Sequence, residues 1–157
     1  YLNPHIPDKL SGTTLNYKFR GGKLVIGLDK GRYSVSNAQF KVTSAKNFGF
    51  NAGKNELEYF NLNNNVYSLK AQLITKNNLS VEIIKWNDKE CVWNQTAPLK
   101  TGKITYSACK LKADNKYAIK IDGQISKTLK SDKEGNLRFD VNAKTATTEI
   151  RIQLLND

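Results

Sequence analysis

Methionine is absent from the 157 residues, even at position 1, and histidine occurs once, as His5. A sequence that begins without methionine leads us to expect a processed or recombinant piece of a longer protein, attached to a domain upstream. No apolar run approaches the roughly 20 residues that a membrane helix needs, so we expect no membrane span. Any signal peptide would precede Tyr1.

The residues that usually carry catalysis are also scarce. His5 stands between Pro4 and Pro7 in an extended terminal segment, so a Ser or Cys nucleophile would lack its usual base. The 14 acidic residues fall mostly in turns or on the polar faces of alternating segments, where turn chemistry and solvation explain them. No catalytic constellation is visible, and whether the chain belongs to an enzyme depends on residues upstream.

Cysteine occurs only twice, as Cys91 and Cys109. Their spacing fits no zinc pattern, and a single histidine cannot complete a usual structural site. Gly21-Gly22-Lys23 leads into a strand pattern rather than a helix, so it is not a phosphate-binding loop. We therefore expect no metal and no cofactor.

The two cysteines have a second interpretation. If the segments near 90–95 and 103–109 form a hairpin centred on residue 100, Cys91 and Cys109 fall opposite each other. We then expect them on neighbouring strands, with a disulfide as one outcome and two buried free thiols as the other. A disulfide would indicate an oxidising compartment.

Acidic residues are in the minority, and the formal net charge is +11. Residues 1–76 hold eleven Lys and Arg against four Asp and Glu, a balance of +7, whereas residues 77–157 hold fourteen against ten, a balance of +4. Such an excess attracts nucleic acid, acidic polysaccharide or anionic lipid. Lysines on exposed strand faces also keep sheets soluble, which is the simpler explanation. The candidate contacts for an anionic ligand are Lys18, Arg20, Lys23 and Arg32.

What the sequence does contain is period-two alternation, with almost no helical periodicity. Tyr117, Ile119 and Ile121 alternate with polar residues, as do Leu137, Phe139 and Val141, and turn residues separate such segments at short intervals. This pattern predicts an all-β fold of antiparallel strands, packed as one or more immunoglobulin-like β-sandwiches. A phase break between Ile83 and Ile84 predicts a β-bulge.

The strands divide at Asn77-Asn78 in our interpretation. About seven strands follow this point, which suits an immunoglobulin-like module over residues 77–157. Residues 1–76 would form a β-rich region with five or six strands, either a second small sandwich or the end of a larger one.

Aromatic residues that interrupt the alternation or flank loops are candidates for sugar contacts, because sugar CH faces stack on aromatic rings. One of the two tryptophans is expected in the sandwich core. The candidate platforms are Phe48, Phe50, Phe60, Trp86 and Trp93.

The segment from residue 104 to residue 139 resembles a known group of modules. It contains Ile104-Thr-Tyr106, Leu111-Lys-Ala-Asp-Asn115, Tyr117-Ala-Ile-Lys-Ile-Asp122-Gly123, Ser131-Asp132-Lys-Glu-Gly135 and Leu137-Arg-Phe139. These motifs are similar to the C-terminal immunoglobulin-like and fibronectin-III-like modules of secreted bacterial polysaccharide-degrading enzymes, and the resemblance covers residues 79–155. It implies that Tyr117 packs inward, that Asp122-Gly123 closes a hairpin, and that the Ser131–Gly135 segment closes the next one.

The resemblance implies a secreted or surface-exposed accessory module without catalysis of its own, which binds carbohydrate or serves as a scaffold. The basic first half favours an acidic polysaccharide as partner. Three alternatives stay open: a purely structural or adhesin module, the C-terminal part of an enzyme whose catalytic residues lie upstream, and a nucleic-acid binder. Nucleic acid is disfavoured because only four of the 25 basic residues are Arg.

Overall fold

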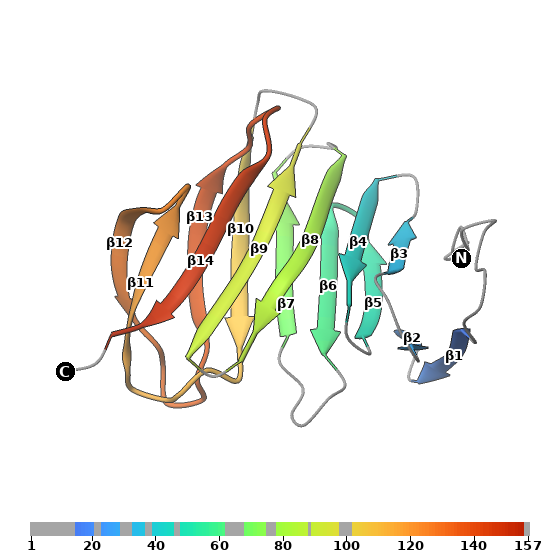
Figure 1. Ribbon diagram of the computed structural model, residues 1–157, viewed down its shortest axis with the longest axis horizontal. Coiled ribbons are helices and arrows are strands. Elements are labelled where there is room, and N and C mark those ends of the chain that lie inside the picture. The colour runs from blue at the N-terminus through green and yellow to red at the C-terminus, as the bar shows by residue number, and fades with distance from the viewer. Residues whose placement is uncertain are drawn as a thin grey trace.

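The computed structural model describes residues 15–20, 23–28, 33–36, 39–45, 48–61, 68–74, 78–87, 89–97 and 102–155. These residues form fourteen β-strands and no helix, arranged in two layers (Figure 1). None of the described residues belongs to a helix long and apolar enough to cross a membrane. The predicted all-β sandwich is confirmed.

Each layer is a seven-stranded sheet. Sheet A has the order β1 (Leu15–Arg20), β2 (Lys23–Leu28), β5 (Phe48–Gly53), β6 (Glu56–Asn61), β7 (Ser68–Leu73), β10 (Lys103–Cys109) and β13 (Leu137–Asn142). Sheet B has the order β12 (Gln124–Lys130), β11 (Lys116–Ile121), β14 (Thr148–Leu154), β9 (Glu90–Thr96), β8 (Leu79–Trp86), β4 (Phe40–Ser44) and β3 (Tyr33–Ser36). The described pairings are antiparallel except that between β4 and β8, which is parallel.

Alternation along the strands explains how the sheets pack. In β10, Ile104, Tyr106 and Ala108 are completely buried, while Thr105 and Ser107 between them are partly exposed. Successive side chains of a strand point to opposite faces, so each such strand contributes one apolar face to the interior. The inner faces of both sheets form one hydrophobic core.

Trp93 of sheet B is the large residue at the centre of this core. It is fully buried, and its ring lies 5.0 Å from that of Tyr106 and 6.2 Å from that of Phe139, both on sheet A. The Tyr106 hydroxyl donates a 2.7 Å hydrogen bond to Gln95 Oε1, which satisfies a polar group deep in the core. Trp93 is thus the core tryptophan that the sequence predicted.

The expected boundary near residue 77 does not separate two sheets. β7 lies between β6 and β10 in sheet A, and β4 pairs with β8 in sheet B. Seven of the described strands follow residue 77, as expected, but seven rather than five or six precede it. Each sheet contains a block of strands from either side of residue 77, and the two blocks share one core.

The hairpin predicted for the two cysteines is wrong. β9, which carries Cys91, belongs to sheet B and pairs with β8 and β14, whereas β10, which carries Cys109, belongs to sheet A. The connection from β9 to β10 crosses between the layers, so the two cysteines are not on neighbouring strands. Both are free thiols, Cys91 buried and Cys109 partly exposed.

Several local predictions are confirmed. The bulge falls between Ile83 and Lys85. Asp122 and Gly123 adopt φ of 49° and 81° and connect β11 to β12 as a two-residue hairpin turn with both angles positive. Tyr117 is buried, and its hydroxyl oxygen accepts a 2.9 Å hydrogen bond from the Lys112 amide, an arrangement typical of the tyrosine corner of β-sandwiches.

The segment Ser131–Gly135 forms a tight turn, but it does not close a hairpin. It connects β12 of sheet B to β13 of sheet A. Asp132 Oδ1 accepts hydrogen bonds from the amides of Glu134 and Asn136 at 2.9 and 2.7 Å. These local bonds are available to an Asp turn whatever sheet the next strand joins, which is why the sequence motif did not reveal the crossover.

Candidate functional site

Most of the aromatic residues expected to contact sugars lie inside the protein. Phe48, Phe50 and Trp93 are at most 1% exposed, and Phe60 is 6% exposed. Their ring faces are therefore inaccessible to a polysaccharide in this structure. Trp86 is partly exposed, but its ring stacks on Trp93 at a centroid distance of 6.0 Å and an angle of 29°.

The basic residues expected to contact an anionic ligand lie at the far end of sheet A. The β1–β2 register places Arg20 opposite Lys23 and Lys18 opposite Val25. The structure therefore brings three of the four predicted basic residues onto one two-stranded ribbon. Arg32 lies outside the described residues.

A second basic surface lies where β10, β11, β12 and β13 are joined, and the sequence did not single it out. We call it the basic end and define it as residues 110–116 and 130–136. It contains five lysines and three acidic residues, a balance of +2. The two segments are held together by backbone hydrogen bonds, from Leu111 N to Gly135 O at 3.0 Å and from Ser131 N to Asn115 O at 2.9 Å.

Not all lysines of the basic end are equivalent. Lys130 pairs with Asp114 at 3.1 Å, and Asp132 uses its carboxylate within its own turn. Hydrogen bonds, first of all from the Asn136 amide, hold the pKa of Asp132 below its usual range. The remaining lysines are exposed and have no carboxylate partner among the described residues: Lys110, Lys112, Lys116 and Lys133.

The outer face of sheet B carries a cluster of charges that neutralise one another. Glu90 lies between Lys85, at 2.5 Å, and Arg151, at 2.6 Å, and Arg151 also contacts Glu149 at 3.1 Å. The hydrogen bond from Lys85 is the main cause that lowers the pKa of Glu90, and Arg151 adds to it. Cations that are already paired in this way offer less to an outside anion than those of the basic end.

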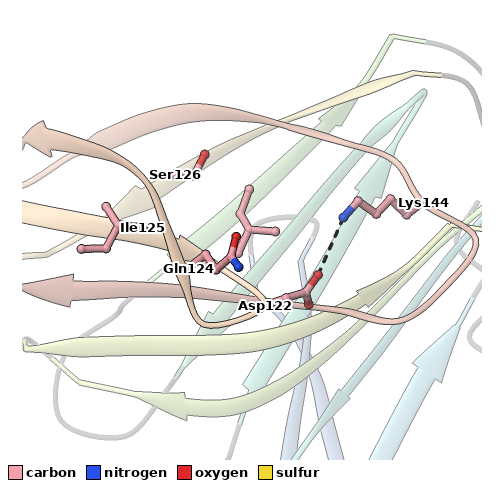
Figure 2. Close-up of a pocket in the computed structure, with 6 residues that line it drawn as sticks. Asp122, Gln124, Ile125, Ser126 and Lys144 are labelled. Carbon is pink, nitrogen blue, oxygen red and sulfur yellow. Dashed lines mark ion pairs between the residues drawn. The ribbon is translucent and has the colours of Figure 1, made fainter.

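A groove of about 380 Å³ lies beside the β11–β12 turn (Figure 2). Its lining consists of Ile121, Asp122, Gln124, Ile125, Ser126 and Lys144. Asp122 Oδ2 is 3.7 Å from Lys144 Nζ, and the two side chains are 52% and 54% exposed. The groove combines a carboxylate, an ammonium group, an amide and a hydroxyl with two isoleucines.

Only part of the groove was predictable from the sequence. It identified Asp122-Gly123 as a turn, and no local feature connected this turn with Lys144, which follows β13. Among the described residues, no three His, Cys, Asp or Glu side chains lie close enough together to hold a metal ion.

Comparison with known proteins does not assign a function to these surfaces. No protein-family model matches the chain, and no curated protein and no solved structure matches it either.

Proposed function

We propose that the chain is a non-catalytic accessory β-sandwich of a secreted or surface-exposed polysaccharide-degrading enzyme, and that it binds an acidic polysaccharide. The observation that carries the proposal is the contrast between buried aromatic rings and exposed, unpaired lysines. Four of the five predicted platforms are buried, so stacking on described rings is not the main way to hold a sugar. Four lysines of the basic end are exposed and have no acidic partner in the part of the chain that the structure describes.

Charge recognition of this kind is weak for each contact and additive along a polymer. An exposed ion pair contributes about 0.2–1 kcal/mol. A polymer that contacts several lysines at once accumulates these contributions, and the attached catalytic domain then works at a raised effective substrate concentration. The resemblance of residues 79–155 to modules of polysaccharide-degrading enzymes supports the same role.

The test is affinity gel electrophoresis with alginate, chondroitin sulfate and neutral dextran, at low and at physiological salt. We expect retardation by the acidic polymers that falls as salt rises, since screening acts over about 8 Å at physiological ionic strength. The triple variant Lys110→Glu, Lys112→Glu, Lys133→Glu should weaken binding by on the order of tenfold.

The control is a second triple variant with the same total change in charge, made at lysines outside the basic end. Lys41, Lys54 and Lys103 are also exposed lysines without a described acidic partner, and they lie on other strands and turns. Reversing these three should leave most of the affinity intact. Equal loss in both triple variants would mean diffuse attraction, and a larger loss from Lys18→Glu, Arg20→Glu would move the surface to the β1–β2 ribbon.

Two outcomes would replace the proposal. If the protein binds neither acidic polymer at low salt, the proposal is replaced by a structural or adhesin role. Tighter binding to single-stranded DNA of matched charge than to both polysaccharides would favour nucleic acid.

A further inference from the structure

We propose that the groove beside the β11–β12 turn is a subsite for one pyranose ring of the bound polysaccharide. The inference rests on the proposed function, because it names the part of the ligand that this groove recognises. It assigns hydroxyl recognition to the groove and leaves charge recognition to the basic end.

The groove is built by backbone that is fixed on both sides. On one side, Asp122 exchanges two hydrogen bonds with Glu149, from Asp122 N to Glu149 O and from Glu149 N to Asp122 Oδ1, each 2.9 Å. On the other side, the Lys144 carbonyl accepts a 3.1 Å bond from the Ala97 amide. A site held by secondary structure and backbone bonds orders few groups when a ligand arrives, so little affinity is lost to ordering.

Asp122 and Lys144 lie close enough together for one oxygen atom beside them to bridge both. The separation of 3.7 Å between Asp122 Oδ2 and Lys144 Nζ is longer than a hydrogen bond, although the two groups face each other (Figure 2). Oδ1 is occupied by the Glu149 amide, whereas Oδ2 is directed toward Lys144. A sugar hydroxyl can donate to Oδ2 and accept from Nζ at the same time. Separating an ion pair this exposed costs little.

The other lining groups match the remainder of a pyranose ring. Gln124 and Ser126 are exposed, and their side chains have no hydrogen-bond partner among the described residues, so they can bind further hydroxyls. Ile125 is 63% exposed, and with Ile121 it offers apolar surface to the CH groups of a sugar. The volume lies within the range of small-ligand pockets.

The test is an NMR titration of the whole ¹⁵N-labelled chain with three tetrasaccharides. The first is a hexuronate tetrasaccharide from alginate, the second is a tetrasaccharide from chondroitin sulfate, and the third is a neutral tetrasaccharide from dextran. We expect at least one of them to shift the amide signals of Gln124, Ser126 and Lys144 in a saturable way. The variants Asp122→Asn and Lys144→Gln should each weaken that binding by roughly tenfold or more. Asn accepts the Glu149 amide and tolerates a positive φ, so Asp122→Asn keeps the turn.

Lys103→Gln is the matched control. It removes one positive charge from an exposed lysine outside the groove lining, and we expect unchanged affinity. If no tetrasaccharide shifts the groove signals up to about 10 mM, a concentration that detects even very weak binding, the subsite is refuted. If the tetrasaccharides shift only signals of the basic end, and Asp122→Asn is without effect, the proposed function stands and the subsite does not.

Discussion

Gly135 gives the sharpest test of how the basic end is held in shape. Its φ is +76°, in the left-handed region, and a Cβ added there would lie 2.1 Å from the carbonyl oxygen of Leu111. No real Cβ comes that close to an oxygen, and the obstacle is backbone rather than a flexible side chain. Gly135→Ala must therefore both strain its own backbone and push apart the segments 110–116 and 130–136.

The magnitude follows from these two effects. A residue with a Cβ in the left-handed region costs about 1–2 kcal/mol. Relieving the contact with Leu111 disrupts the hydrogen bond from Leu111 N to Gly135 O, currently 3.0 Å, for about 1 kcal/mol more. We expect Gly135→Ala to lower the free energy of unfolding by about 2–3 kcal/mol.

Gly123 is a natural control for this substitution. Its φ is +81°, and a Cβ at that position would have nothing within 4 Å. Gly123→Ala should therefore show the backbone cost alone, about 1–2 kcal/mol. Urea unfolding followed by the fluorescence of the stacked pair Trp86 and Trp93 measures both variants. Equal destabilisation by the two substitutions would show that the contact with Leu111 contributes nothing, and our reasoning about this end of the sandwich would fail.

Three further predictions concern the core and its edges. Tyr117→Phe removes the acceptor of the Lys112 amide and should cost about 1–3 kcal/mol of stability in the same urea assay; a loss below 0.5 kcal/mol would contradict the tyrosine corner. Because the folded-state pKa of Glu90 lies below its unfolded value of about 4.5, its stabilisation is fully present above that value and is lost as pH falls through the folded pKa. Glu90→Gln should therefore destabilise more at pH 7 than at pH 3, and an equal effect at both would refute the ion-pair explanation. Alkylation of the native protein should modify partly exposed Cys109 before buried Cys91, with no mass change on prior reduction; modification of Cys91 first would contradict its burial.

Local structure was predictable from the sequence because local rules determine it. The Asp122-Gly123 turn needs two positive φ angles, which few residue pairs adopt easily, and the bulge after Ile83 appears as a shift in the alternation. Strand pairing was not predictable in the same way. β9 and β10 alternate as two arms of a hairpin would, and nothing in their pattern says that the loop between them crosses to the other sheet.

The interruptions of the alternation that pointed to the aromatic candidates can have two physical causes. Phe48 and Phe50 flank Gly49, which lies in β5 directly opposite Phe60. A Cβ on Gly49 would lie 2.0 Å from the Phe60 ring, so the glycine leaves room for this ring. An interruption of the alternation can thus serve close packing within a sheet as readily as ligand contact, and only the register separates the two.

The groove shows most clearly why a site can escape sequence reasoning. Asp122 and Lys144 meet because β14 lies between β11 and β9, so the chain after β13 returns to sheet B next to β11. In the sequence they are separated by the whole of β12 and β13, and each has the ordinary role of a polar residue next to a strand.

The net charge of +11 is a limited guide to binding surfaces, because it counts cations without regard to their neighbours. Lys85 and Arg151 both contact Glu90, so the outer face of sheet B holds positive side chains that are already compensated. At the basic end, the Asp132 carboxylate accepts hydrogen bonds within its own turn, and lysines such as Lys110 and Lys112 have no acidic partner among the residues that the structure describes. A basic residue is available to a polymer only if it is not already paired with an acidic residue of the protein. For this reason the folded structure, rather than the charge balance of either half of the sequence, determines which lysines the binding experiments should reverse first.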